Sequence, residues 1–351
     1  MWTGDPLYPN LYVFLVGHPG VGKSRAITTA TKYLREVPDI HLAPTSLTMA
    51  SLVDCMSAAT RTINVQGEPA PIQYNSLAVF PSEFQTFMCE YDASLIGGLT
   101  QFYDCEEYGQ HRRGKEIKIK IKHPQLSILV GITPSNLLSK SVMPEAAWDQ
   151  GFLSRTILVF SDERPTIEDI FATDIHELPE ELTDDLKAIS NLVGQFSIDT
   201  SFRTAYGHWR NDLGEAPKPD HPRLRHYCTR RMSHVLKLSM VSAADRSDKL
   251  SLELYDFERA LAWLEEAERT MGDVFDCATQ GADSKAVEEI YHYALSNGGT
   301  VQEHAIIRYA LKRIPIHSVE RAIRLMVQSK MLQVVATDPK TGSSTFKVIR
   351  D

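Results

Sequence analysis

Hydrophobic residues in the first half of the chain occur as short, nearly unbroken runs rather than as an alternating pattern. The clearest runs cover residues 11–16, 77–80, 126–131 and 156–160, and a weaker one covers residues 40–43. Such runs are typical of strands that are buried on both faces of a parallel sheet. Residues 46–59 predict a helix, and residues 61–74, which carry glycine and proline, predict a loop or a small excursion from the core. The pattern therefore predicts an α/β core over residues 1–165, with helices flanking a parallel sheet.

Beyond a linker at residues 161–175, the hydrophobic period changes to that of helices. Helices are predicted at residues 179–196, 199–213, 224–242 and 255–271, with no good core strand among them. We therefore predict an all-α region over residues 166–280.

The last segment, residues 281–351, combines both patterns. Helices are predicted at residues 285–296, 302–311 and 317–331, and strands at residues 332–337 and 344–349. The residues between the two strands have the composition of a turn. Three helices followed by a two-stranded hairpin are the plan of a winged helix, so a C-terminal winged-helix domain is predicted.

Composition narrows the class of protein. A chain of 351 residues is long for one core. Its net charge of −8 means that any nucleic-acid contact has to come from local basic patches. The five cysteines form no C-x-x-C pair, which argues against a zinc site and against a disulfide framework. The run at residues 11–16 is too short to span a bilayer, and no signal-peptide pattern precedes it. We expect a cytoplasmic protein with no membrane partner.

The segment that follows the first predicted strand carries the strongest chemical signal. It reads Gly-His-Pro-Gly-Val-Gly-Lys-Ser and fits G-x-x-x-x-G-K-[ST] at every fixed position. Glycines let backbone N–H groups converge on phosphates, and the helix N-terminus adds a partial positive charge. The predicted cofactors are ATP and Mg²⁺, with Lys23 at the β- and γ-phosphates and the Ser24 hydroxyl as metal ligand. The expected nucleotide contacts from the loop are Gly17, Pro19, Gly20, Val21, Gly22, Lys23 and Ser24. A glycine-rich turn without a ligand is the alternative.

A second candidate lies just after the run at residues 77–80. A buried strand that delivers an acidic residue to the carboxyl edge of the sheet predicts Glu83 as the group that polarises the attacking water. Ser82 stands where an Asp that supports Mg²⁺ is usual, so either another acid helps or hydrolysis is slow. Alternatively, Glu83 is a first-turn residue that complements the helix dipole.

Two later segments offer polar groups for the same site. Thr133 and Asn136 follow the strand at residues 126–131 and are predicted to sense the γ-phosphate. Arg155 precedes the last strand and is predicted to act as an arginine finger on a neighbouring subunit, or else as a surface ion-pair partner. A basic group in the helical region allows a second nucleotide contact, a DNA contact or plain solvation. It comprises Arg223, Arg225, Arg230 and Arg231.

Two basic features predict DNA contact. In a hairpin at about residues 108–123, isoleucines occupy one face of a strand and lysines the other, because side chains alternate along a strand. The predicted contacts are Arg112, Arg113, Lys115, Lys118, Lys120 and Lys122. A solvated edge strand protected by lysine is the alternative. In the winged helix the predicted contacts are Arg321, Arg324 and Lys340, although many winged helices contact only protein.

The order of these segments resembles a family of primase-linked, helicase-like P-loop ATPases found in phages and mobile elements. The matching stretches are GHPGVGKS, SLTMASLVDCM, LAVFPSEF, YDCEEY, PQLSILVGITPSNL and GFLSRTILVF, within residues 11–160. The resemblance implies an ATPase of the ring-forming helicase type. It places Lys23, Ser24, Glu83, Thr133 and Arg155 in matching motif positions. Ser82 departs from the Asp-Glu pair of the family.

These observations predict an ATP-dependent helicase or translocase that grips single-stranded DNA in the pore of a ring of its own copies. A primase or polymerase is expected as a separately encoded partner. The first alternative is an ATP-switched initiator or helicase loader that binds duplex DNA and hydrolyses ATP slowly. The second is a regulatory, protein-binding ATPase with no nucleic-acid role.

Overall fold

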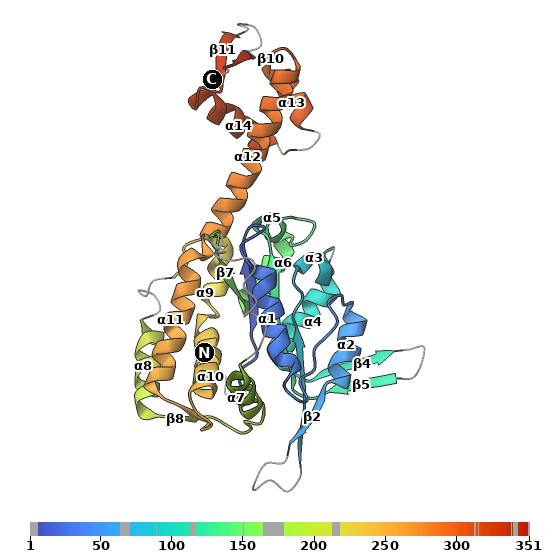
Figure 1. The fold of residues 1–351 in the computed structure, drawn as a ribbon, viewed down its shortest axis with the longest axis vertical. Helices are drawn as coiled ribbons and strands as arrows, with labels where there is room; N and C mark the ends of the chain where they lie inside the picture. Colours follow the sequence, from blue (N-terminus) through green and yellow to red (C-terminus); the bar gives the residue numbers. More distant parts are fainter. Residues whose placement is uncertain are drawn as a thin grey trace. The chain divides into compact units, whose positions relative to one another are not determined.

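The computed structural model describes residues 6–63, 71–88, 90–112, 117–149, 151–163, 179–212, 218–311, 314, 316–337, 339 and 343–349. The chain divides into two compact units, Met1–Val274 and Phe275–Asp351 (Figure 1). The predicted core and the predicted all-α region therefore belong to one unit. Helix α11 (Leu254–Met271) packs against strand β7 (Thr156–Phe160) of the core, and α10 (Arg231–Arg246) packs against α11.

The centre of the first unit is a five-stranded sheet in the order β2-β3-β6-β1-β7. Its strands are β1 (Tyr12–Val16), β2 (Thr60–Ile63), β3 (Ile72–Val79), β6 (Pro124–Ile132) and β7 (Thr156–Phe160). Strands β3, β6, β1 and β7 run parallel to one another, whereas β2 is antiparallel to β3. The predicted α/β core is confirmed, but the sheet is mixed rather than wholly parallel.

Two local predictions at the β3 edge were wrong. Residues 40–43 do not form a strand; only Leu42 makes a parallel bridge, to Ala78. Pro44 follows directly and has no N–H to continue the pairing. Part of residues 61–74, predicted as a loop or a small excursion, is paired in strands and forms the hairpin of β2 and β3, in which the side-chain amide of Asn75 donates to the Thr60 hydroxyl at 3.0 Å.

Helices flank this sheet in the first unit (Figure 1). They are α1 (Lys23–Arg35), α2 (Met49–Ala58), α3 (Phe84–Phe87), α4 (Ala93–Tyr103), α5 (Pro134–Leu137), α6 (Glu145–Asp149) and the 3₁₀ turn η1 (Leu153–Arg155). Tyr12 and Phe14 of β1 are fully buried and contact these helices: the Tyr12 hydroxyl donates to the Leu99 carbonyl at 2.6 Å, and the Phe14 ring lies 5.4 Å from the Phe84 ring.

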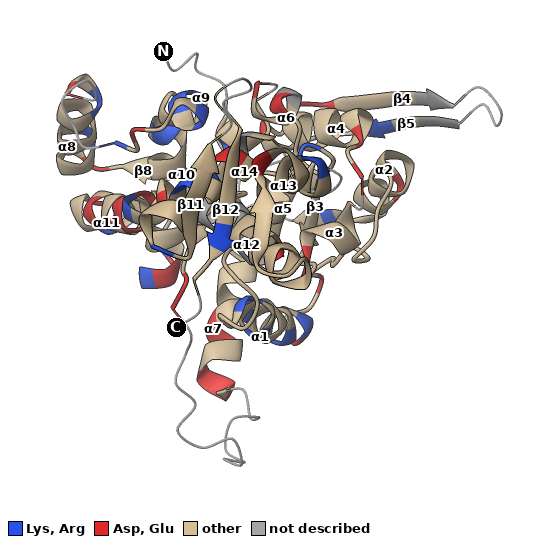
Figure 2. Ribbon diagram, turned by 90° about the horizontal axis from the view of Figure 1, so that it is seen from above, with Lys and Arg blue, Asp and Glu red and all other residues tan. Residues whose placement is uncertain are grey.

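The predicted basic hairpin is present as β4 (Tyr108–Arg112) paired antiparallel with β5 (Ile117–Ile121). It precedes β6 directly in the chain, so it lies at the amino end of that strand. Ile121 is fully buried, whereas Lys120 and Lys122 are exposed, as the alternation predicts. The described lysines of β5 appear blue in Figure 2.

The helical part of the first unit contains α7 (Glu180–Ser190), α8 (Thr200–Asn211), η2 (Pro222–Leu224), α9 (Arg225–Cys228), α10 and α11. One helix predicted at residues 224–242 is interrupted between α9 and α10. Two short strands, β8 (Ser197–Ile198) and β9 (Ser251–Leu252), pair within this helical part.

The second unit contains α12 (Asp273–Ser296), β10 (Thr300–Gln302), α13 (Glu303–Ala310), α14 (Ile316–Gln328), β11 (Leu332–Thr337) and β12 (Ser344–Val348). The strands form an antiparallel sheet in the order β10-β12-β11, so β10 is a strand that the sequence did not predict. The hydrophobic core of the second unit is built from residues that include Ile290, Ile306, Val319, Met326, Leu332 and Phe346.

Within the described ranges, no helix combines the length and the apolar character needed to cross a membrane.

Candidate functional site

The carboxyl edge of the parallel strands brings the predicted site segments together. The glycine-rich loop follows β1, Ser82 and Glu83 follow β3, and Thr133 follows β6. Hydrogen bonds continue past the strand ends: the Gly17 amide donates to the Ile132 carbonyl at 3.2 Å. Because parallel strands end at the same edge, residues far apart in sequence become neighbours here.

Glycine is required in the loop for two different reasons. Gly20 and Gly22 have φ angles of 92° and 90°, which side chains rarely adopt. At Gly17 a Cβ atom would lie less than 3.0 Å from the Ser161 carbonyl oxygen and from Val21. Helix α1 begins directly after Gly22, and no side chain caps its first N–H groups. The loop therefore presents unpaired amide donors at a helix N-terminus.

Lys23 is turned back over this loop. Its ammonium group donates to the Gly17 carbonyl at 2.8 Å and to the His18 carbonyl at 3.0 Å, and the residue is 8% exposed. Ser24, next along α1, is exposed. The loop thus combines one cation, one open hydroxyl and the helix N-terminus in a single turn of chain.

Glu83 lies half-buried at the start of α3, where its side chain caps no amide. The next residue, Phe84, is 1% exposed and fixes the segment by packing on Phe14. Ser82 is exposed. Across the described part of the chain, no group of three or more His, Cys, Asp and Glu side chains is arranged to hold a metal ion.

Thr133 and Asn136 adopt a local capping arrangement. The Thr133 hydroxyl accepts from the Asn136 amide at 3.3 Å and lies 3.1 Å from the Ser135 hydroxyl. Both Thr133 and Asn136 remain half-buried at the carboxyl edge. The structure therefore brings both predicted residues to the same edge as Gly17 and Glu83.

Arg155 lies elsewhere. The register of β1 with β7 pairs Tyr12 with Thr156, so Arg155 is at the amino edge of the sheet. The length of β1, about 16 Å for its five residues, separates it from the glycine-rich loop. It is 8% exposed, pairs with Asp104 through two nitrogens and donates to the Gly151 carbonyl at 2.9 Å. This burial conflicts with the finger role predicted for Arg155, and Asp104 was not predicted as its partner.

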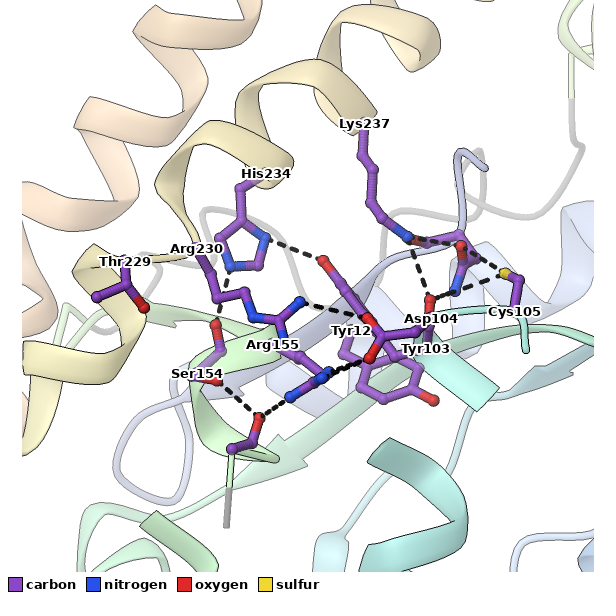
Figure 3. Close-up of polar contacts among 12 residues, drawn as sticks. Tyr12, Tyr103, Asp104, Cys105, Ser154, Arg155, Thr229, Arg230, His234 and Lys237 are labelled. Carbon is purple, nitrogen blue, oxygen red and sulfur yellow. Dashed lines mark hydrogen bonds and ion pairs between the residues drawn. The ribbon is translucent and has the colours of Figure 1, made fainter. Parts of the chain in front are cut away.

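The Asp104 carboxylate also pairs with Arg230, which belongs to the helical part of the unit, at a distance of 3.3 Å (Figure 3). Other members of the predicted basic group are paired as well: Arg231 is fully buried against Glu268 at 2.7 Å, and Arg223 pairs with Glu145. Ion pairing within the protein therefore accounts for three of these four arginines, and Arg225 is exposed.

Lys237 of α10 completes this interior cluster (Figure 3). Its ammonium group donates to the backbone and side-chain oxygens of Asn10 at 2.9 and 2.7 Å, and it lies 4.0 Å from the centre of the Tyr103 ring. Burial lowers the pKa of Lys237 to about 8 and raises the pKa of the nearby Cys105 thiol to about 12. Sequence reasoning missed this group, because a lysine inside an amphipathic helix usually faces solvent.

His234, one turn earlier on α10, is fully buried between two polar groups. Its Nε2 lies 3.1 Å from the Ser154 carbonyl, which can only accept, so Nε2 carries the proton. Its Nδ1 then accepts from the Tyr103 hydroxyl at 3.3 Å. The neutral ring satisfies both contacts, and burial lowers the pKa of His234 to about 3.

The predicted DNA-contacting residues divide between described and undescribed positions. Lys120 pairs with Glu107 at 3.0 Å, with both side chains more than half exposed, and Lys122 is exposed. Arg321 and Arg324 are exposed on α14. Arg113, Lys115 and Lys340, and the side chains of Arg112 and Lys118, lie outside the described residues.

No protein-family model matches the chain, and no curated protein matches it either. The function therefore has to be argued from the site itself.

His234 predicts an acid-sensitive contribution to stability. The folded-state pKa of about 3 lies below the ordinary value of 6.5, so the unfolded chain binds more protons between these two pH values. This contribution is present above pH 6.5 and is lost as the pH falls toward 3, with a slope of about 1.4 kcal/mol per pH unit from one group. His234→Gln, which keeps a donor and an acceptor, should make the pH dependence of chemical denaturation shallower by that amount. The exposed His208→Gln is the control, and equal slopes in the two variants would contradict the prediction.

Proposed function

We propose that this protein is a P-loop ATPase that binds Mg²⁺ and ATP at the carboxyl edge of its sheet. The observation that carries the proposal is the geometry of the glycine-rich loop. Two glycines in left-handed conformations lead into an uncapped helix N-terminus, and the first residue of that helix is the buried Lys23. Backbone N–H groups, a helix dipole and a cation around one loop are the donor set that phosphates require.

The residues at this edge fit the nucleotide. The loop amides from His18 to Ser24, apart from Pro19, which has no N–H, would hold the phosphates. Lys23 would exchange its two loop carbonyls for phosphate oxygens. The exposed Ser24 hydroxyl would be the protein's ligand to Mg²⁺. The metal supplies charge neutralisation for phosphoryl transfer when it is bound.

Glu83 is the proposed general base. Its side chain caps no amide, and the packing of Phe84 fixes its backbone at the same edge as the loop. Thr133 and Asn136 would orient the attacking water or contact the γ-phosphate. Ser82 offers only a hydroxyl where a carboxylate would hold the metal's water shell more strongly, so we expect slow turnover.

The favoured use of this site is an ATP-driven DNA helicase or translocase of phage or mobile-element replication, acting as a ring. The lysine face of β5 supports this use, because Lys120 and the following Lys122 are exposed while Ile121 between them is buried. Such a face provides a track for the phosphates of a single strand. A separately encoded primase or polymerase would then be its partner.

Three observations favour the alternative, an ATP-switched initiator or helicase loader. Arg155 is held inside the protein by Asp104, which removes the expected finger from the subunit surface. Ser82 weakens metal binding. In the second unit, β10 lies between α12 and α13, and β11 and β12 follow α14, an arrangement that supports a winged helix with Arg321 and Arg324 facing solvent. A loader would bind duplex DNA through α14.

Lys23→Ala should weaken nucleotide binding without unfolding the protein. A charge-assisted hydrogen bond contributes about 1.5–3 kcal/mol, so affinity for a fluorescent ATP analogue should fall at least about tenfold. Lys32→Ala, an exposed lysine on the same helix, is the matched control. Unchanged affinity in a folded Lys23→Ala protein would rule out the phosphate-loop assignment.

Glu83→Gln should keep nucleotide binding but lower ATP turnover by about 100-fold or more, because an amide cannot accept the proton of the attacking water. Steady-state phosphate release measures this effect. The exposed Glu90→Gln serves as control. Normal turnover in Glu83→Gln would mean that the catalytic carboxylate lies elsewhere.

Replacing Lys118, Lys120 and Lys122 with Ala should weaken single-strand binding and its salt dependence. The slope of log affinity against log salt should fall by roughly 0.7 per lost phosphate contact. The control removes three positive charges elsewhere, at the exposed Lys32, Lys218 and Lys249. Equal slopes for the two triple variants would mean that the lysine face is a solvated edge. A strand-displacement assay then separates the two uses: ATP-dependent unwinding supports the motor, and duplex binding without unwinding supports the loader.

A further inference from the structure

Gly131 occupies a crowded position in the sheet. It is the penultimate residue of β6, it is buried, and it pairs with Leu15 of β1. On the other side of β6, the pairing with β3 ends at Val79. The chain that leaves β3 toward Glu83 then approaches β6 again at Gly131.

Two segments meet at the place where Gly131 has no side chain. A Cβ atom there would lie less than 3.0 Å from the Ser82 carbonyl oxygen and 3.5 Å from Cδ1 of Ile27. The Ser82 contact is to backbone, so no side-chain rotation relieves it. Ile27 is 1% exposed and lies one helical turn after Lys23 on α1. The missing methyl group thus lets the Ser82–Glu83 segment and the helix that carries Lys23 approach the same point of β6.

We infer that Gly131 is a positioning residue for ATP hydrolysis, because its lack of a side chain sets where Glu83 stands relative to the phosphate loop. Gly131 touches neither nucleotide nor water; it acts through the Ser82 carbonyl. The inference rests on the proposed function of Glu83.

A methyl group added at position 131 should lower ATP turnover while leaving nucleotide binding nearly unchanged. Relieving the contact with the Ser82 carbonyl requires a backbone shift on the order of 1 Å, and a displacement of that size costs about 100-fold in rate when it moves a catalytic group. The loop after β1 is held by its own glycines and by Lys23, and the three atoms nearest to a Cβ at position 131 belong to Ser82 and Ile27 rather than to that loop. The shift therefore falls on Glu83 rather than on the phosphate contacts.

The test is Gly131→Ala, with equilibrium binding of a non-hydrolysable ATP analogue and steady-state turnover measured on the same preparations. We expect binding within about threefold of wild type and turnover lower by about 10- to 100-fold. Gly97→Ala is the matched control, because a Cβ at Gly97 meets nothing within 4 Å. Wild-type turnover in Gly131→Ala, or equal losses of binding and turnover, would overturn the inference.

A double-mutant cycle tests whether the effect passes through Glu83. In a Glu83→Gln background, Gly131→Ala should lower turnover no further, since the group it displaces is already inactive. A full additional loss would show that Gly131 acts by another route. If wild-type protein binds no nucleotide, both the proposed function and this inference are wrong. Normal wild-type binding and turnover, with an unaffected Gly131→Ala, overturn the inference alone.

Folding of the variant is checked by thermal denaturation. If Gly131→Ala is not folded at the assay temperature, binding and turnover of the variant and of wild type are compared at a lower temperature at which both are folded. The variant should then show the same loss of turnover with retained binding. Turnover equal to that of wild type at that temperature would overturn the inference.

Discussion

The burial of β1 between β6 and β7 is the constraint on which the rest of the first unit depends. Both edges of β1 are hydrogen-bonded to parallel neighbours, and Tyr12 and Phe14 are fully buried. Pairing with two parallel neighbours fixes the edge of the sheet at which each end of β1 lies. The glycine-rich loop has to emerge at the edge where β3 and β6 also end, beside Glu83 and Thr133. The chemistry proposed for this edge is therefore a consequence of parallel pairing.

The opposite end of β1 is fixed by charge. Asn10, just before β1, accepts two hydrogen bonds from Lys237, and Asp104 holds Arg155 and Arg230. Taking these charges out of water costs free energy that their pairing has to offset, so such groups specify an arrangement more than they stabilise it. Here they join α10 to the amino edge of the sheet, and the helical part becomes one body with the core. The same pairing keeps Arg155 away from the protein surface.

The two edges carry different parts of the functional proposal. The carboxyl edge has the donors for phosphates and a carboxylate for water, with Gly131 governing how closely the two approach. At the amino edge, Asp104 holds Arg155 inside the protein, away from the surface that a neighbouring subunit would contact in the proposed ring. An ATPase with Ser82 beside its base and Arg155 in the interior would turn over slowly by itself. Both a regulated motor and a nucleotide switch are compatible with that behaviour.

Local patterns in the sequence determined the strands that become the parallel array, the glycine-rich loop and the alternation of Ile and Lys in β5, because each depends on residues close together in the chain. The tertiary structure decided what depends on distant partners. The hairpin of β2 and β3 needs Asn75 to reach Thr60, and the break before α10 lets Arg230 and Arg231 reach Asp104 and Glu268. The burial of Lys237 and of Arg155 has the same cause. Their partners, Asn10 and Asp104, lie far away in the sequence, and only folding brings each pair together.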